Sequence, residues 1–73
     1  MPTDFKPMAN VGPGVAELRV HVGGEYRVLF VARFDEAVYV LHAFEKRTRK
    51  TSQIALDLAR TRLRQLQRAR ERW

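Results

Sequence analysis

The sequence predicts an α+β domain, in which a three-stranded antiparallel meander is followed by one long C-terminal helix. Apolar and polar side chains alternate over residues 15–44 with two interruptions by turn residues, which is typical of short strands joined by hairpins. From residue 52 onward the apolar positions recur at helical spacing. Because strands joined by short turns pair with their neighbours in the chain, the meander should precede the helix as βββα.

The chain of 73 residues should form one domain over residues 1–73, near the lower size limit for a self-sufficient core. It contains no cysteine, which excludes disulfides, thiolate catalysis and cysteine zinc sites and is compatible with a reducing cytoplasm. No stretch approaches the ~20 apolar residues of a membrane span, and the N-terminus does not resemble a signal peptide. We expect a cytoplasmic protein with no membrane association.

The first fourteen residues hold all three prolines and two of the four glycines. Proline removes a backbone donor and glycine favours turns, so we expect residues 1–14 to form an irregular arm.

The first predicted strand runs from Val15 to Val22 and is half-buried. One of its faces is apolar, formed by Ala16, Leu18, Val20 and Val22, and the other carries Glu17, Arg19 and His21. Gly23-Gly24 then provides the positive backbone angles of a tight hairpin.

The second strand should run from Glu25 to about Arg33, and the third from Ala37 to Phe44, with a turn at Asp35-Glu36. Both are largely apolar on both faces, which predicts that the second strand is covered on both sides. One helix cannot cover both faces. We therefore expect a symmetric homodimer to hide the remaining one.

The helix should begin at Ser52, with Thr51 as its N-cap, and end at about Arg70. Its apolar stripe comprises Ala55, Leu58, Ala59, Leu63, Leu66, Ala69 and Trp73, and the opposite side carries Asp57, Arg60, Arg64 and Arg68. Arg62 and Arg70 fall inside the apolar stripe. Either the apolar contact is narrow, or these two guanidiniums reach across it toward an acidic group.

The net positive charge lies in the second part of the chain. Residues 1–44 have a net charge of −1 and residues 45–73 a net charge of +7. Such a basic segment favours a polyanionic partner, because cations that neutralise phosphates release counterions. The alternative is a solvated loop and helix face.

Two arginines should lie together on the sheet. If Gly23-Gly24 closes the hairpin, Arg19 and Arg27 become cross-strand neighbours whose like charges oppose pairing. An anion such as phosphate between them would offset this cost. An ordinary salt bridge of Glu17 with one arginine on a wet face is the structural alternative.

His42 ends an apolar stretch just before the basic turn, where it could donate or accept a proton. The alternative is an imidazole that is bonded to backbone. No carboxylate lies at ligand spacing from a histidine, so we expect no metal site.

Three segments are followed by a helix that contains Arg62: Glu17-Leu18-Arg19, Tyr26-Arg27-Val28-Leu29-Phe30, and the stretch from Leu41 to Thr51, LHAFEKRTRKT. In this order they resemble the phage-derived HigB-like branch of the RelE/ParE toxin superfamily. The resemblance covers about Phe5 to Leu66. It implies a RelE-like fold and the toxin of a type II toxin–antitoxin pair, which cuts mRNA on the ribosome. The implied partners are a helix-turn-helix antitoxin, the ribosome and mRNA.

The resemblance also implies the site of a metal-independent endoribonuclease with no cofactor. The catalytic residues would be Arg27, His42, Lys46 and Arg47, and the phosphate- or RNA-binding residues would be Arg19, Arg49, Lys50 and Arg62. Members of the superfamily usually begin with a helical hairpin, so we expect this chain to be an N-terminally short form. Ser52 replaces the proline of the family pattern, and either residue can begin a helix.

A second function remains open. A degenerate toxin that has lost catalysis would still serve as an antitoxin-binding or RNA-binding module. Growth arrest on expression separates the two, since only the active nuclease should arrest cells.

Overall fold

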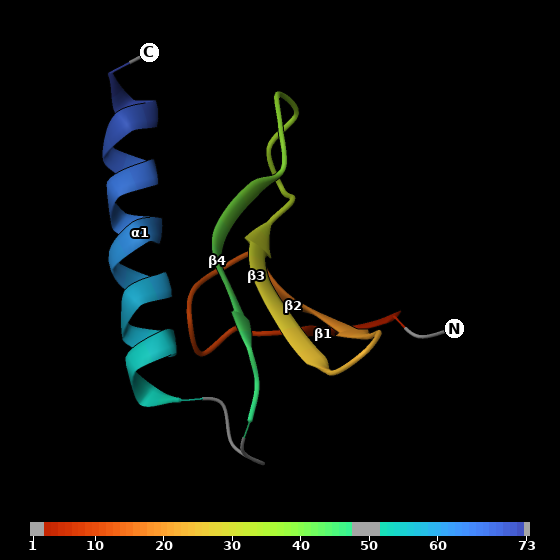
Figure 1. The fold of residues 1–73 in the computed structure, drawn as a ribbon. Coiled ribbons are helices and arrows are strands. Elements are labelled where there is room, and N and C mark those ends of the chain that lie inside the picture. The colour runs from red at the N-terminus through yellow and green to blue at the C-terminus, as the bar shows by residue number, and fades with distance from the viewer. Residues whose placement is uncertain (1–2, 48–51, 73) are drawn as a thin grey trace.

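A computed structural model describes residues 3–47 and 52–72, which form a four-stranded antiparallel sheet and one helix (Figure 1). The elements are β1 Thr3–Pro7, β2 Val15–His21, β3 Glu25–Val31, β4 Tyr39–Glu45 and α1 Gln53–Glu71. Each strand pairs with the next along the chain, so the sheet order is β1-β2-β3-β4. The expected α+β class and the meander followed by a long helix are confirmed, with one strand more than expected.

The additional strand lies in the segment that we expected to be an irregular arm. β1 pairs with β2 from Thr3 opposite Val20 to Pro7 opposite Ala16, so the expectation was wrong for residues 3–7. Proline is compatible with an edge strand because only one side of that strand is hydrogen-bonded. Pro7 is also the last residue of β1, where the loss of one donor costs little.

The turns and the end of the helix follow the local sequence. Gly23 and Gly24 have φ of 67° and 155° and close the β2–β3 hairpin as expected. The hydroxyl of Ser52 accepts a hydrogen bond from the amide of Ile54 at 3.2 Å, which makes Ser52 the N-cap of α1. Thr51, the expected N-cap, lies outside the described residues.

The core lies between α1 and one face of the sheet. Ala59 and Leu63 of the helix pack with strand residues and with the loop of residues 8–14. The buried members of this cluster are Met8, Val11, Val15, Leu29, Val31, Leu41, Ala59 and Leu63. Of the strands, α1 contacts β4 most, and the shared cluster puts Val15 and Leu29 on the side of the sheet that faces the helix.

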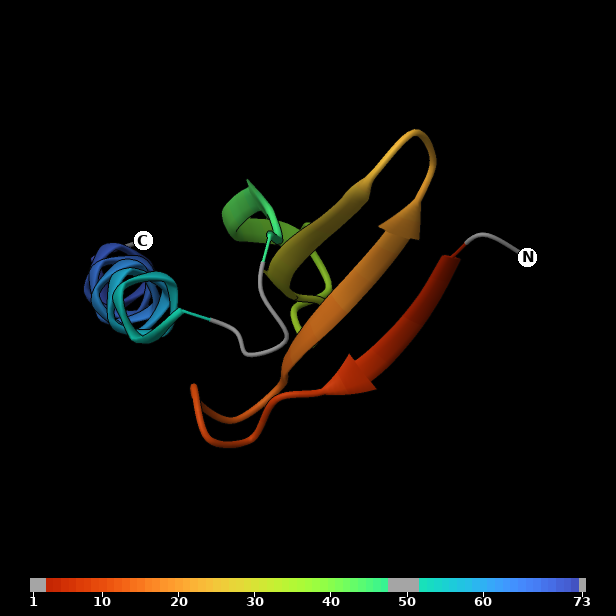
Figure 2. The ribbon, with the colours of Figure 1, turned by 60° about the horizontal axis from the view of Figure 1, so that its bottom comes forward.

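The loop of residues 8–14 is fastened to the helix, and Figure 2 shows it extending toward α1. The Arg60 guanidinium donates two hydrogen bonds to the carbonyl of Asn10, at 2.9 and 3.2 Å. A Cβ at Gly12 would collide with the side chain of Leu63, so the loop backbone approaches the helix closely. The helix is therefore held by both the sheet and this loop.

Of the two arginines inside the apolar stripe, Arg70 reaches an acidic group, as one of our two alternatives proposed, whereas Arg62 reaches a backbone carbonyl. Arg70 pairs with the Glu36 carboxylate, with N–O distances of 2.8 and 3.1 Å. Arg62 donates to the carbonyl of Leu41 at 2.7 Å. No helix within the described residues is long and apolar enough to cross a membrane.

The opposite face of the sheet is apolar and contributes nothing to the buried core. By strand register it carries Phe5, Ala16, Leu18, Val20, Tyr26, Val28, Phe30, Val40 and Ala43, which we call the open face. Phe5 and Val40 are 71% and 61% exposed. Within one chain the second expected strand, β3, is therefore covered by α1 on one face only, and coverage of the other face by a second copy stays a prediction.

We expect the open face to drive self-association, since contiguous apolar patches of this kind usually mark an interaction surface. The variant Val40→Glu should shift the protein to monomer at tens of micromolar, as measured by sedimentation velocity. Val38→Glu is the matched control, because Val38 is also 61% exposed but lies in the loop before β4. A monomeric parent protein, or equal effects of the two substitutions, would contradict this expectation.

Candidate functional site

A charged cluster occupies the covered face of the sheet near the β2–β3 hairpin. Arg19 and Arg27 are directly opposite each other in the register, as expected. The Glu17 Oε1 atom lies 3.0 Å from Arg19 Nε and 3.5 Å from Arg27 Nε. The expected salt bridge of Glu17 is present, but the carboxylate is not on a wet face, because Glu17 is only 2% exposed and Arg27 only 5%.

The donors of Arg27 are directed at protein groups. Its Nη1 donates to the Tyr26 carbonyl at 3.3 Å and its Nη2 to the Glu25 carboxylate at 3.1 Å. Its buried Nε makes no hydrogen bond within the described residues, so the approach to Glu17 is an ion pair without good hydrogen-bond geometry. The hydrogen bond from Arg27 is the largest cause of the lowered pKa of Glu25.

Arg19 is the more accessible cation of the cluster. Its side chain is 33% exposed, and among the described residues only its Nε is engaged, by Glu17. A guanidinium carries five N–H donors, so the two terminal nitrogens of Arg19 are available to an anion. The cluster can therefore receive a phosphate at Arg19, and at Arg27 only where the phosphate replaces the half-exposed Glu25.

His42 lies on the same face, and the helix orients its ring. Arg62 Nη1 is 3.3 Å from His42 Nδ1. Because a guanidinium only donates, Nδ1 must accept, and the proton of the neutral ring resides on Nε2. Burial, and secondarily the positive charge of Arg62, lower the pKa of His42. In this arrangement His42 is neutral at pH 7 and offers an Nε2–H donor.

The strand register brings His42 close to the arginine pair. Phe44 is opposite Arg27, and His42 is opposite Leu29, so His42 and Arg27 are diagonal neighbours with backbones about 7–8 Å apart. The Phe44 ring stacks on His42 with centroids 5.1 Å apart and an angle of 19° between the planes. Sequence reasoning assigned Phe44 to the third strand without a role in the site. The alternation His-Ala-Phe, which puts both rings on one face, was the available signal.

The basic turn is only partly described. The amide of Lys46 donates to the Glu25 carbonyl at 2.7 Å, which extends the ladder beyond β4. Arg47 is exposed and lies 3.4 Å from the Glu45 carboxylate. The two expected RNA-binding residues of the turn, Arg49 and Lys50, lie outside the described residues. Within residues 3–47 and 52–72, no three histidine or carboxylate side chains gather as metal ligands would.

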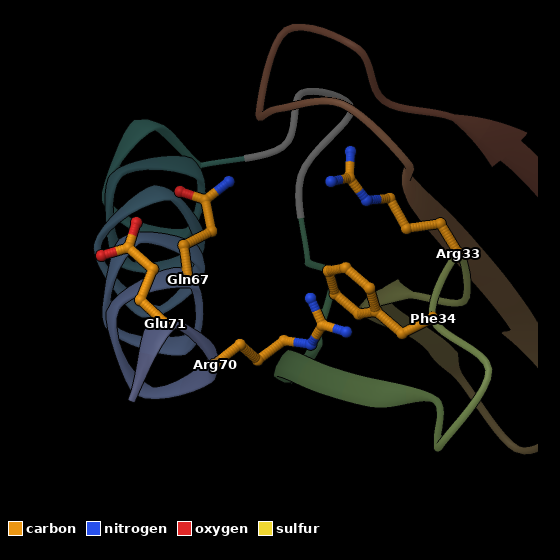
Figure 3. A pocket seen from close by; sticks show the side chains of 5 residues that line it. All are labelled: Arg33, Phe34, Gln67, Arg70 and Glu71. Atoms are coloured by element: carbon orange, nitrogen blue, oxygen red, sulfur yellow. The ribbon is translucent and has the colours of Figure 1, made fainter. Parts of the chain in front are cut away.

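A second cluster, in which sequence reasoning did not identify the partners of Arg70, joins the end of α1 to the loop before β4. The Arg70 guanidinium lies 3.5 Å from the centroid of the Phe34 ring (Figure 3). It also donates to Glu36, whose pKa falls to about 2 chiefly through that hydrogen bond. The Tyr39 hydroxyl donates to the same carboxylate at 2.9 Å. The available signal was the position of Arg70 inside the apolar stripe, with an acidic turn upstream.

Beside this second cluster is an open pocket of about 350 Å³, lined by Arg33, Phe34, Gln67, Arg70 and Glu71. Arg33 also approaches the Phe34 ring, at 5.0 Å from its centroid. The pocket mixes cations with a carboxylate. None of the sequence-predicted site residues lines it.

The lowered pKa of His42 predicts a pH-dependent contribution to stability. A group whose pKa is depressed by folding stabilises the native state above its unfolded pKa of about 6.5, and this contribution is lost as the pH falls through the folded pKa. The difference in unfolding free energy between the parent and His42→Gln should therefore shrink on acidification below pH 6.5. Denaturant titrations across pH 5–8 would measure it. A difference that stays constant, or grows toward pH 5, would contradict a lowered pKa of His42 in the folded protein.

The comparisons with known proteins give one family. The model of the family described as "Phage derived protein Gp49-like (DUF891)" matches residues 1–64, most of the chain. No curated protein matches the sequence, and no solved structure matches it. The matched residues include the whole sheet, both arginines of the charged cluster, His42 and Arg62.

Proposed function

The chain belongs to the phage-derived Gp49-like family, a relative of the RelE/HigB-like toxins, and we propose that it is the toxin of a type II toxin–antitoxin pair that cuts mRNA on the ribosome. The observation that supports this proposal best is the arrangement on one face of the sheet. Two arginines lie opposite each other, and a neutral histidine is the diagonal neighbour of Arg27.

This arrangement suits RNA cleavage without a metal. The 2′-hydroxyl attacks the neighbouring phosphorus, the bond to the 5′-oxygen breaks, the 2′-proton passes to a base such as water, and the leaving oxygen takes up a proton. Cations placed at the phosphate stabilise the negative charge that develops. Arg19 would hold a non-bridging oxygen, and the His42 Nε2–H would hydrogen-bond the leaving oxygen and stabilise its charge, while water supplies the proton that this oxygen takes up. Lys46 and Arg47 would neutralise adjacent phosphates.

Arg27 can take part only by exchanging a partner. Its Nη2 bonds Glu25, a surface carboxylate whose ion pair contributes little to stability. A phosphate offers more oxygens in the same direction and can replace it. We therefore propose that the catalytic state has Arg27 bonded to RNA and Glu25 released.

One observation favours the second function, a non-catalytic module that binds RNA or antitoxin. Arg27 is almost fully buried, and both its terminal nitrogens already bond to protein groups. In that case Arg27 would serve only to neutralise Glu17. A helix-turn-helix antitoxin remains the proposed protein partner under either function.

Induced expression with and without the cognate antitoxin tests the proposal. The parent protein should arrest growth, and Arg19→Gln should abolish arrest with little change in melting temperature, because Arg19 is partly exposed and Arg27 remains to neutralise Glu17. The matched control is Arg33→Gln, which removes one positive charge at the pocket beside Phe34 and should leave toxicity intact. Absence of arrest by the parent would contradict the nuclease proposal.

Arg27→Met separates the two roles of Arg27. Breaking a buried ion pair costs roughly 3–5 kcal/mol, and since Arg19 still neutralises Glu17, we expect about 3 kcal/mol. Chemical denaturation would measure this loss, and growth arrest would be measured at a temperature where the variant is folded. Retention of full toxicity by the folded variant would show that Arg27 does not contact RNA.

A further inference from the structure

The five arginines of α1, together with Arg72 at its C-cap, fall into two groups. Arg60, Arg62 and Arg70 reach the rest of the molecule, at the carbonyl of Asn10, the carbonyl of Leu41 and the carboxylate of Glu36. The second group consists of Arg64, Arg68 and Arg72, which we call the arginine row. These three side chains are exposed.

No member of the arginine row forms an ion pair within the described part of the chain. Arg64 reaches only the hydroxyl of Thr61, at 3.4 Å, and Arg64, Arg68 and Arg72 are all exposed. Like charges four residues apart on a helix repel and destabilise it. Ion pairs with the described residues therefore do not neutralise the charge of the row.

The row lies on the side of α1 away from the sheet. The buried residues Ala55, Ala59 and Leu63 define the inward side. On a helical wheel Arg68 lies opposite this side, with Arg64 and Arg72 flanking it. Figure 1 shows α1 standing at one side of the sheet with its outer side open, so the row is a surface separate from the charged cluster of Glu17 and the two arginines.

The spacing of the row suits a regular polyanion. A rise of 1.5 Å per residue puts successive members about 6 Å apart along the axis, and the first and last about 12 Å apart. One strand of a nucleic-acid helix carries a phosphate per ~3.4 Å of axis, so the row spans three to four phosphates.

We propose that the arginine row binds the phosphate backbone of RNA and is a second RNA-binding surface, separate from the site of cleavage. The choice of RNA as the nucleic acid rests on the proposed function, whereas the row itself rests on geometry and charge. The row reads no sequence, because it offers contacts to phosphates only. It would add affinity and hold the RNA while the sheet face acts on it.

A salt titration of RNA binding tests this proposal. A fluorescent RNA hairpin would be titrated by anisotropy at several salt concentrations. Each lost phosphate contact should reduce the magnitude of the negative slope of log K against log salt by about 0.9 for a duplex. Arg68→Gln should lower it by about 0.9 and Arg64→Gln/Arg68→Gln by about 1.8. Arg33→Gln, which has the same net charge as Arg68→Gln, should leave the slope unchanged.

Several outcomes would overturn the proposal. These are an unchanged slope in the double variant, an equal effect of Arg33→Gln, an equal slope and affinity on a DNA duplex, or competition by polyglutamate as effective as that by RNA. Circular dichroism should show an intact fold, since both replaced side chains are exposed and, among the described residues, their one hydrogen bond is that of Arg64 to Thr61. Growth arrest reports cleavage and the slope reports the row, so failure of the proposed function and failure of this inference are distinguishable.

Discussion

The buried carboxylate of Glu17 is the interaction on which the charged face of the sheet depends. The β2–β3 register forces Arg19 and Arg27 to lie opposite each other, and two guanidiniums at that position would repel. Glu17 contacts both of them through one oxygen. Because the carboxylate is almost inaccessible to water, its attraction to the arginines is little screened. The sheet can thereby hold two cations side by side.

The helix connects this charged cluster to the apolar core. The same face of β2 and β3 carries Leu29 and Val31, which are completely buried, and the arginine pair near the hairpin. Arg62 of α1 donates both to the Leu41 carbonyl and to the His42 ring, so the docking of the helix sets the tautomer and orientation of the imidazole. A change in helix packing would therefore alter the site even if every site residue were retained.

Much of this arrangement was accessible from the sequence. The Gly23-Gly24 turn and strict alternation predicted the β2–β3 register, and hence the Arg19–Arg27 pair. Alternation could not show which face the helix covers, because the face with Glu17 and Arg19 looked like the wet one. It could not predict β1 either, since the prolines obscured a short edge strand. The Glu36–Arg70 contact joins residues 34 positions apart, and nothing in the local pattern specifies such a pairing.

The most direct test of this account is whether RNA occupies the arginine pair. A short RNA with 2′-O-methyl groups, which cannot be cleaved, would be titrated into ¹⁵N-labelled protein while the arginine Nε–H and histidine resonances are followed by NMR. The account predicts saturable shifts at Arg19 and Arg27 and at His42 Nε2, with one common affinity. Shifts confined to arginines of α1, with the Arg19 and Arg27 resonances unmoved, would contradict it.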